Sequence, residues 1–73
     1  MMNDTERLAH YRQLSPDQRI AKRRLLLQHI MLYKRLRDEA GDNVAAIKHY
    51  KDLAWDCMQQ HALMSQVMRE VML

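Results

Sequence analysis

One pair of side chains in this 73-residue chain has the spacing of a metal site. Cys57 and His61 lie four residues apart, so on a helix both would point to the same side. A thiolate and an imidazole are zinc ligands, and a two-fold dimer would supply a second pair to complete four. The chain has no other cysteine. We expect a small thiol and a polar residue inside a helical interface, with a metal site at Cys57 and His61 as the alternative.

Paired carboxylates are a second pattern that could perform chemistry. Asp52 and Asp56 lie four residues apart on a predicted helix, and such pairs can act as general acid and base. Both fall on the polar side of that helix, where two or three helices enclose no substrate pocket. The single glycine also excludes a glycine-rich phosphate loop. We therefore expect no enzymatic activity and no cofactor.

A basic segment is the strongest feature of the composition. Residues 19–37 hold seven lysines and arginines and no acid, crowded at the two ends of the apolar run LLLQHIMLY. Such clusters, with Arg23 and Arg24 as the candidates, could neutralise the phosphates of a nucleic acid. No aromatic residue is interleaved with AKRR to stack on bases. The alternatives are a solvated rim of a helical assembly or a surface that attracts an acidic protein partner.

Trp55 is the most informative single residue, because it falls on the polar side of its predicted helix near Lys51. Exposed tryptophans are uncommon, and tryptophan is enriched among residues that dominate binding energy. Leu63 and Val67 also point away from the apolar seam of that helix. The alternative is that the N-terminal segment folds back over Trp55. The candidate partner-binding residues are therefore Trp55, Lys51, Leu63, Val67, Arg23 and Arg24.

The elements that position these residues are predicted to be helices in a single all-α domain over 1–73. The chain has one glycine, one proline and no phenylalanine, too few turn residues for a sheet. The sequence LSPDQ starts a helix at Pro16 with Ser15 and Gln18 as a capping box. Gly41 ends that helix. We expect a short helix over about 4–14, capped by Asp4 or Thr5, and long helices over about 16–40 and 43–72, the last capped by Asp42 or Asn43.

The short connection near Gly41 requires the two long helices to form an antiparallel hairpin. In the second of them, apolar residues alternate three and four positions apart, which is the spacing of a heptad seam. The seam consists of Ile47, Tyr50, Ala54, Cys57, His61, Met64, Met68 and Val71.

The first long helix is apolar on two sides, which indicates burial on two sides. One stripe is expected to pack on the second long helix and consists of Ala21, Leu25, Leu32, Leu36 and Ala40, with His29 in it. The other stripe requires a second copy of the chain, which predicts a homodimer and a four-helix bundle. The expected dimer interface is Ile20, Leu27, Ile30 and Met31.

This layout resembles that of the small helical hairpins that dimerise into four-helix bundles, such as the plasmid copy-number regulator Rop. The resemblance is one of architecture, because no residue motif is shared, so it implies nothing about the ligand. The N-terminus lacks the apolar core of a signal peptide, and no apolar run reaches the ~18–20 residues that span a bilayer. We expect a cytoplasmic protein without membrane contact.

The predicted function is that of a small regulatory protein that binds another protein and inhibits it. The basis is surplus apolar surface, Trp55 and the absence of catalytic patterns. By analogy, compact helical proteins of this kind are often encoded by phages or mobile elements. The alternative is a nucleic-acid-binding regulator that uses the basic ends of the first long helix.

Overall fold

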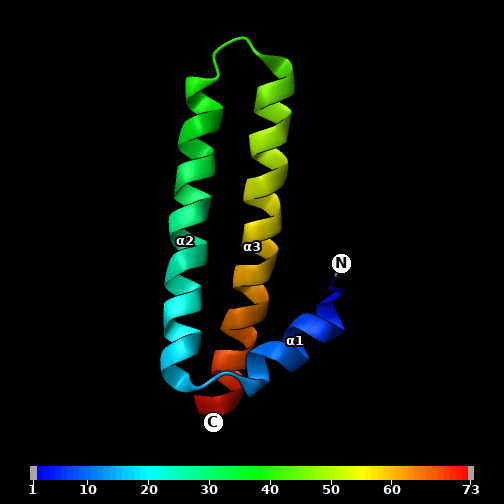
Figure 1. The fold of residues 1–73 in the computed structure, drawn as a ribbon, viewed down its shortest axis with the longest axis vertical. Coiled ribbons are helices and arrows are strands. Elements are labelled where there is room, and N and C mark those ends of the chain that lie inside the picture. Colours follow the sequence, from blue (N-terminus) through cyan, green and yellow to red (C-terminus); the bar gives the residue numbers. More distant parts are fainter. Residues whose placement is uncertain (1, 73) are drawn as a thin grey trace.

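The computed structural model describes residues 2–72, with the side chain of residue 72 left aside, and all regular structure in that range is helical. The helices are α1 (Asp4–Gln13), α2 (Pro16–Glu39) and α3 (Val44–Met72). Figure 1 shows α2 and α3 side by side as a long hairpin, with α1 lying across the C-terminal half of α3. The observed bounds lie within one residue of those expected, and the all-helical hairpin is confirmed.

The start of α2 follows from its capping residues. The Ser15 hydroxyl accepts a hydrogen bond from the Gln18 amide at 3.2 Å, and the Gln18 side chain accepts one from the Ser15 amide at 2.9 Å. Pro16 occupies the first turn, where its missing N–H costs no hydrogen bond. This reciprocal capping satisfies free amides at the helix start, as the sequence predicts.

The other helix ends also have local causes. Gly41 has φ +61°, a left-handed conformation that a side chain disfavours, and it turns the chain between α2 and α3. Asn43, one of the two expected caps of α3, accepts a hydrogen bond from the amide three residues on, at 3.1 Å. The expected cap of α1 was wrong. Asn3 fills that position instead of Asp4 or Thr5, because its side chain accepts the amide of Glu6 at 2.9 Å.

The side of α2 that packs on α3 differs from both predicted stripes. Leu26 is 2% exposed and forms a core cluster with Ile30 and Cys57, against which Tyr33 packs. Ile30 was expected in a dimer interface, and that prediction is wrong because it is buried within the hairpin. Leu25 was expected to pack on α3 and instead is 42% exposed.

The cause is the rotation of about 100° per residue along a helix. The three consecutive leucines, Leu25, Leu26 and Leu27, point in three directions, and α2 carries further apolar residues in each direction. Hydrophobic pattern alone therefore does not decide which side faces α3. In α3 the predicted seam is largely confirmed, with Ala54, Cys57 and Met64 buried.

The short helix α1 covers part of α3 that was expected to be free. Tyr11 packs with Met64 and Val67 in a second core cluster, and Leu63 packs against it. Val67 is fully buried, so its predicted role in partner binding is wrong, and Leu63 is half-buried in the same contact. The reason is that α1, with its own apolar residues Leu8 and Leu14, occupies this side of α3.

Polar contacts hold α1 in this position. The Tyr11 hydroxyl donates to Gln60 at 3.3 Å, and Arg7 forms an ion pair with Asp56 at 3.5 Å. Farther along, both Nε and Nη2 of Arg12 donate to the carboxylate of Glu70 at 3.0 Å. The bidentate bond lowers the pKa of the Glu70 carboxyl, because it favours the ionised form.

Arg19 joins α1 to α2. It is 8% exposed, although it belongs to the basic segment. Its Nε donates to the carbonyl of Tyr11 at 3.0 Å, and its Nη2 donates to that of Arg12 at 2.8 Å. The last carbonyls of a helix lack intrahelical partners and carry partial negative charge, so a guanidinium there is favourable. Arg19 therefore caps the C-terminal end of α1 from within α2.

We predict that Arg19→Ala lowers the free energy of unfolding by about 2–4 kcal/mol, because it removes two charged hydrogen bonds to the carbonyls at the end of α1. Urea unfolding followed by circular dichroism at 222 nm measures the change. Arg24→Ala is the matched control, since Arg24 is exposed, and its effect should stay within about 0.5 kcal/mol. Equal effects of the two variants would contradict the role of Arg19.

Candidate partner-binding face

Trp55 lies exposed on α3, on a side that α1 does not cover. Its side chain is 60% exposed, and the α1 residues that were the alternative cover for it pack on Met64 and Val67 instead. Trp55 lines a hollow of about 260 Å³ between α2 and α3. The other residues that line it are Lys34, Arg37, Lys51, Asp52, Ala54 and Met58. The tryptophan is thus the apolar centre of a mainly basic surface.

A second hollow continues this surface toward the start of α2. It has a volume of about 170 Å³ and is lined by Ile20, Arg23, Arg24, Leu27 and Met68. Leu27, Met31 and Lys34 follow one another on one side of α2 at i, i+4 and i+7, so they connect the two hollows. Met31 is 71% exposed.

We name the combined surface the basic–apolar face. It consists of Ile20, Arg23, Arg24, Leu27, Met31, Lys34 and Arg37 from α2 and of Lys51, Trp55, Met58 and Met68 from α3.

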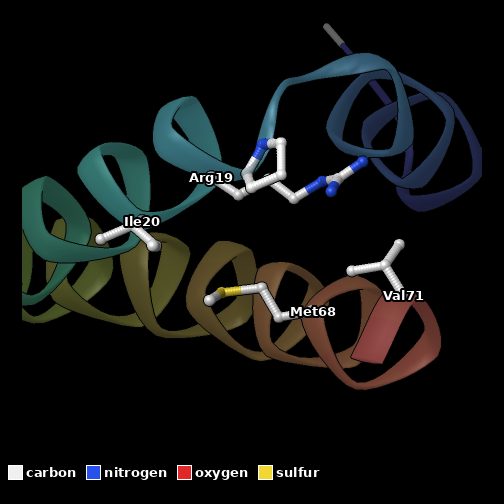
Figure 2. Close-up of a pocket in the computed structure, with 5 residues that line it drawn as sticks. Arg19, Ile20, Met68 and Val71 are labelled. Atoms are coloured by element: carbon white, nitrogen blue, oxygen red, sulfur yellow. The ribbon is translucent and has the colours of Figure 1, made fainter. Parts of the chain in front are cut away.

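Figure 2 shows the end of the face near the C-terminal part of α3. Ile20 and Met68 reach toward each other from α2 and α3, and Val71 lies one turn farther along α3. Together with Pro16 and Arg19 they line a hollow of about 150 Å³. Arg23 places its Nη1 3.7 Å from the sulfur of Met68. The apolar floor is therefore open here and is bordered by a cation.

The charges of the face are unbalanced. Within residues 2–72 the ion pairs use Arg7, Arg12, Arg35, Arg37 and Lys48. In the same range no acid lies within 4.0 Å of Arg23, Arg24, Lys34 or Lys51, all on the basic–apolar face. Asp52, which borders the Trp55 hollow, is 3.9 Å from Lys48. The face therefore has a positive potential that would attract anionic groups.

The structure brings together two sets of predicted residues that the sequence had kept apart. The partner candidates Trp55, Lys51, Arg23 and Arg24 share this one face with the dimer candidates Ile20 and Leu27. The third dimer candidate, Met31, lies one turn after Leu27 at the border of the face and lines a separate hollow with Gln28, Leu32 and Arg35. Ile30, Leu63 and Val67 do not belong to it, as described above. A single occupant of the face would therefore contact residues that had been assigned to two different partners.

Sequence reasoning named Lys34 and Arg37 only as part of the basic segment and did not place them, or Met58, beside Trp55. Met58 could have been found, because it follows Trp55 by three residues and therefore lies on the same side of α3. Lys34 and Arg37 come from α2. Placing them beside Trp55 requires the register between the two helices, which the sequence pattern does not provide.

The predicted metal-ligand pair lies inside the hairpin. Cys57 is buried against Leu26 and Ile30, and the Nε2 atom of His61 is buried without a hydrogen-bond partner in the described range. No group of three or more His, Cys, Asp or Glu side chains there is close enough to hold a metal ion. Burial raises the pKa of the Cys57 thiol, Asp56 raises it further, and Lys22 opposes both effects. The thiol is thus held in its neutral form.

Comparison of the chain with protein-family models, with curated proteins and with solved structures finds no match. The geometry of the chain itself therefore carries the functional interpretation. Within residues 2–72, no helix combines the length and the apolar character needed to cross a membrane.

We predict that the Cys57 thiol reacts at least about tenfold more slowly with a disulfide reagent in the folded chain than in urea, because it is buried and protonated. Stability should also fall as the pH rises above about 8.5, since the unfolded chain loses the thiol proton there and the folded chain retains it. Cys57→Ala should remove this fall between pH 8 and 9.5, below the range where Tyr11, whose pKa burial also raises, begins to titrate. Urea midpoints at the two pH values measure the effect, and equal slopes in both proteins would contradict it.

Proposed function

We propose that this chain is a small non-enzymatic regulatory protein that binds another protein through the basic–apolar face. The observation that supports this most directly is Trp55, which stays exposed beside Met58 although the chain has a helix, α1, that covers other apolar residues of α3. A tryptophan at the centre of a binding face can supply much of its affinity, because desolvating its ring is favourable.

The unpaired cations indicate the chemistry of the partner. Arg23, Arg24, Lys34 and Lys51 surround apolar side chains, so a complementary surface carries acidic residues around an apolar centre. Along α2 the part of the face from Ile20 to Lys34, its last unpaired cation on that helix, is about 21 Å long at 1.5 Å per residue. An amphipathic helix of about four turns with acidic flanks matches this length and lies in the groove between α2 and α3.

Occupation of a partner's surface is the mode of action that this geometry favours. The chain has a binding face and, in the described range, no pocket arranged for chemistry. It would therefore act by covering an acidic, apolar surface that the partner uses for another contact. Inhibition is the expected outcome of such binding.

A nucleic-acid backbone is the second candidate occupant, because the same four unpaired cations could contact phosphates. Phosphate contacts use only the charges of the face and would leave Ile20, Leu27 and Met31 exposed to water. A protein partner uses the cations and the apolar residues together. The face therefore favours a protein, and nucleic-acid binding is an outcome that the experiment below can reveal.

A homodimer that forms a four-helix bundle is the remaining part of the proposal. It is supported by the exposed apolar residues on two sides of α2, where Leu25 and Leu32 lie on one side and Ile20, Leu27 and Met31 on the other. A 73-residue chain buries a small core, and a second copy would bury more apolar surface.

We predict that the chain retains a protein from a lysate of its source cells and that Trp55→Ala weakens this binding about 30-fold or more, since tryptophan hot spots contribute ~2 kcal/mol or more. His49→Ala is the matched control, because His49 is an exposed aromatic residue on another side of α3, and it should bind as the wild type does. Isothermal titration calorimetry of the purified pair measures the affinities, because Trp55→Ala removes the chain's single tryptophan and with it a fluorescence signal.

Charge reversal of Arg23 and Arg24 in the same assay separates the two occupants. For an acidic protein the association rate should fall and its salt dependence should weaken, with little change in the dissociation rate. Tight binding of generic DNA or RNA that depends steeply on salt and is lost in this variant would overturn the protein-binding proposal.

A further inference from the structure

The second exposed side of α2 has a composition different from that of the basic–apolar face. Its residues alternate three and four positions apart without a break, as in the seam of a coiled coil. We name this side the leucine stripe, and it consists of Gln18, Ala21, Leu25, Gln28, Leu32, Arg35 and Glu39. Leu25 and Leu32 are 42% and 37% exposed. Its only charged members, Arg35 and Glu39, pair with each other at 3.9 Å.

From this contrast we infer that a second copy of this chain covers the leucine stripe, with the two α2 helices antiparallel. The inference rests on the homodimer proposed above and names its interface, which differs from the one that the sequence predicted. Three observations support it: the charges, the register and the shape of the stripe.

The charges exclude the basic–apolar face as the surface between two copies. If two α2 helices met antiparallel about a two-fold axis between Leu27 and Met31, Arg24 would face Lys34 of the partner subunit. A parallel pairing would place each cation against its own copy. Like charges across an interface are strongly unfavourable, and α2 contributes no acid to this face to offset them.

The register of the leucine stripe is self-complementary instead. About a two-fold axis midway between Leu25 and Leu32, each Leu25 meets Leu32 of the partner subunit. Ala21 then meets Leu36 of the partner subunit, a small residue against a large one, and Gln18 meets Glu39 of the partner subunit. Arg35 then lies opposite Lys22 of the partner subunit, and its ion pair with Glu39 of its own chain offsets that repulsion.

The surface of the stripe also has the shape that such packing needs. Gln28, Met31, Leu32 and Arg35 surround a hollow of about 400 Å³. Their positions, i, i+3, i+4 and i+7, are those of the four residues that form a hole for a side chain of a facing helix. In the antiparallel register above, the side chain that enters this hole is Leu25 of the partner subunit.

This arrangement would leave most of both basic–apolar faces free. The leucine stripe and the basic–apolar face lie on different sides of α2, and of the residues of the basic–apolar face only Met31 lines the hollow that the partner subunit's Leu25 would fill. A dimer would therefore present two partner-binding faces, one on each hairpin, and would bind two partner proteins at once.

The test uses two leucines of equal exposure that lie on the two different sides of α2. Leu25 and Leu27 are each 42% exposed, and Leu→Lys changes helix propensity little. Sedimentation equilibrium at tens of micromolar should show a dimer for the wild type and for Leu27→Lys. Leu25→Lys should be a folded monomer, because it buries a lysine next to Arg35 of the partner subunit. Circular dichroism at 222 nm confirms that each variant is folded.

The outcomes separate the interface from the proposals it rests on. If Leu27→Lys dissociates the dimer and Leu25→Lys does not, the leucine stripe is not the interface, although the homodimer stands. A wild type that is monomeric at tens of micromolar overturns the homodimer and the stripe together. The folded, monomeric Leu25→Lys variant should still bind the partner protein, with one partner per monomer instead of two per dimer. Loss of partner binding in this variant would overturn the claim that the two sides work independently.

Discussion

The buried guanidinium of Arg19 sets the geometry on which the rest of the structure depends. It holds the carbonyls of Tyr11 and Arg12, while α1 is itself fixed to α3 through Tyr11 and Arg12. The side of α2 that carries Arg19 must therefore face α1 and α3. Leu26 lies two turns farther along on the same side, so it becomes the core residue of α2. A polar contact near one end thus fixes the rotation of the whole helix about its axis.

That rotation distributes the surplus apolar residues of α2 to two outer sides with different chemistry. One side forms the basic–apolar face together with Trp55 and Met58 of α3, and unpaired cations border it. The other side is the leucine stripe, in which leucines alternate with alanine, glutamine and the ion pair between Arg35 and Glu39. In the proposed assembly, like-charge repulsion disfavours contact between two copies through the first side more than through the second, where Arg35 is paired with Glu39. A partner of opposite charge would have the reverse preference, so we propose a different occupant for each side.

Local signals in the sequence predicted the elements, and long-range contacts decided the surfaces. Ser15, Pro16 and Gly41 act through neighbouring backbone, so the helix ends could be located within one residue. The side of α2 that faces the core could not be predicted, because α2 carries apolar residues on more than one side and the pattern does not show which side packs on α3. The coverage of Val67 by α1 and the burial of Arg19 depend on contacts eight to more than fifty residues apart in the chain. The heptad seam of α3 left Trp55 no place inside, but the sequence did not decide between exposure and cover by the N-terminal segment, and the structure shows it 60% exposed.

The three consecutive leucines allow the rotation of α2 to be measured directly. Leu25→Cys, Leu26→Cys and Leu27→Cys would each be made with Cys57→Ser, and the rate of maleimide labelling would be measured at low and high protein concentration. The thiol of Leu26→Cys should react slowly at both concentrations, because that side faces α3. The thiol of Leu27→Cys should react fast at both, and that of Leu25→Cys should react fast only in dilute solution. Equal rates at the three positions, or labelling of Leu26→Cys as fast as that of either neighbour, would contradict the rotation from which both surfaces follow.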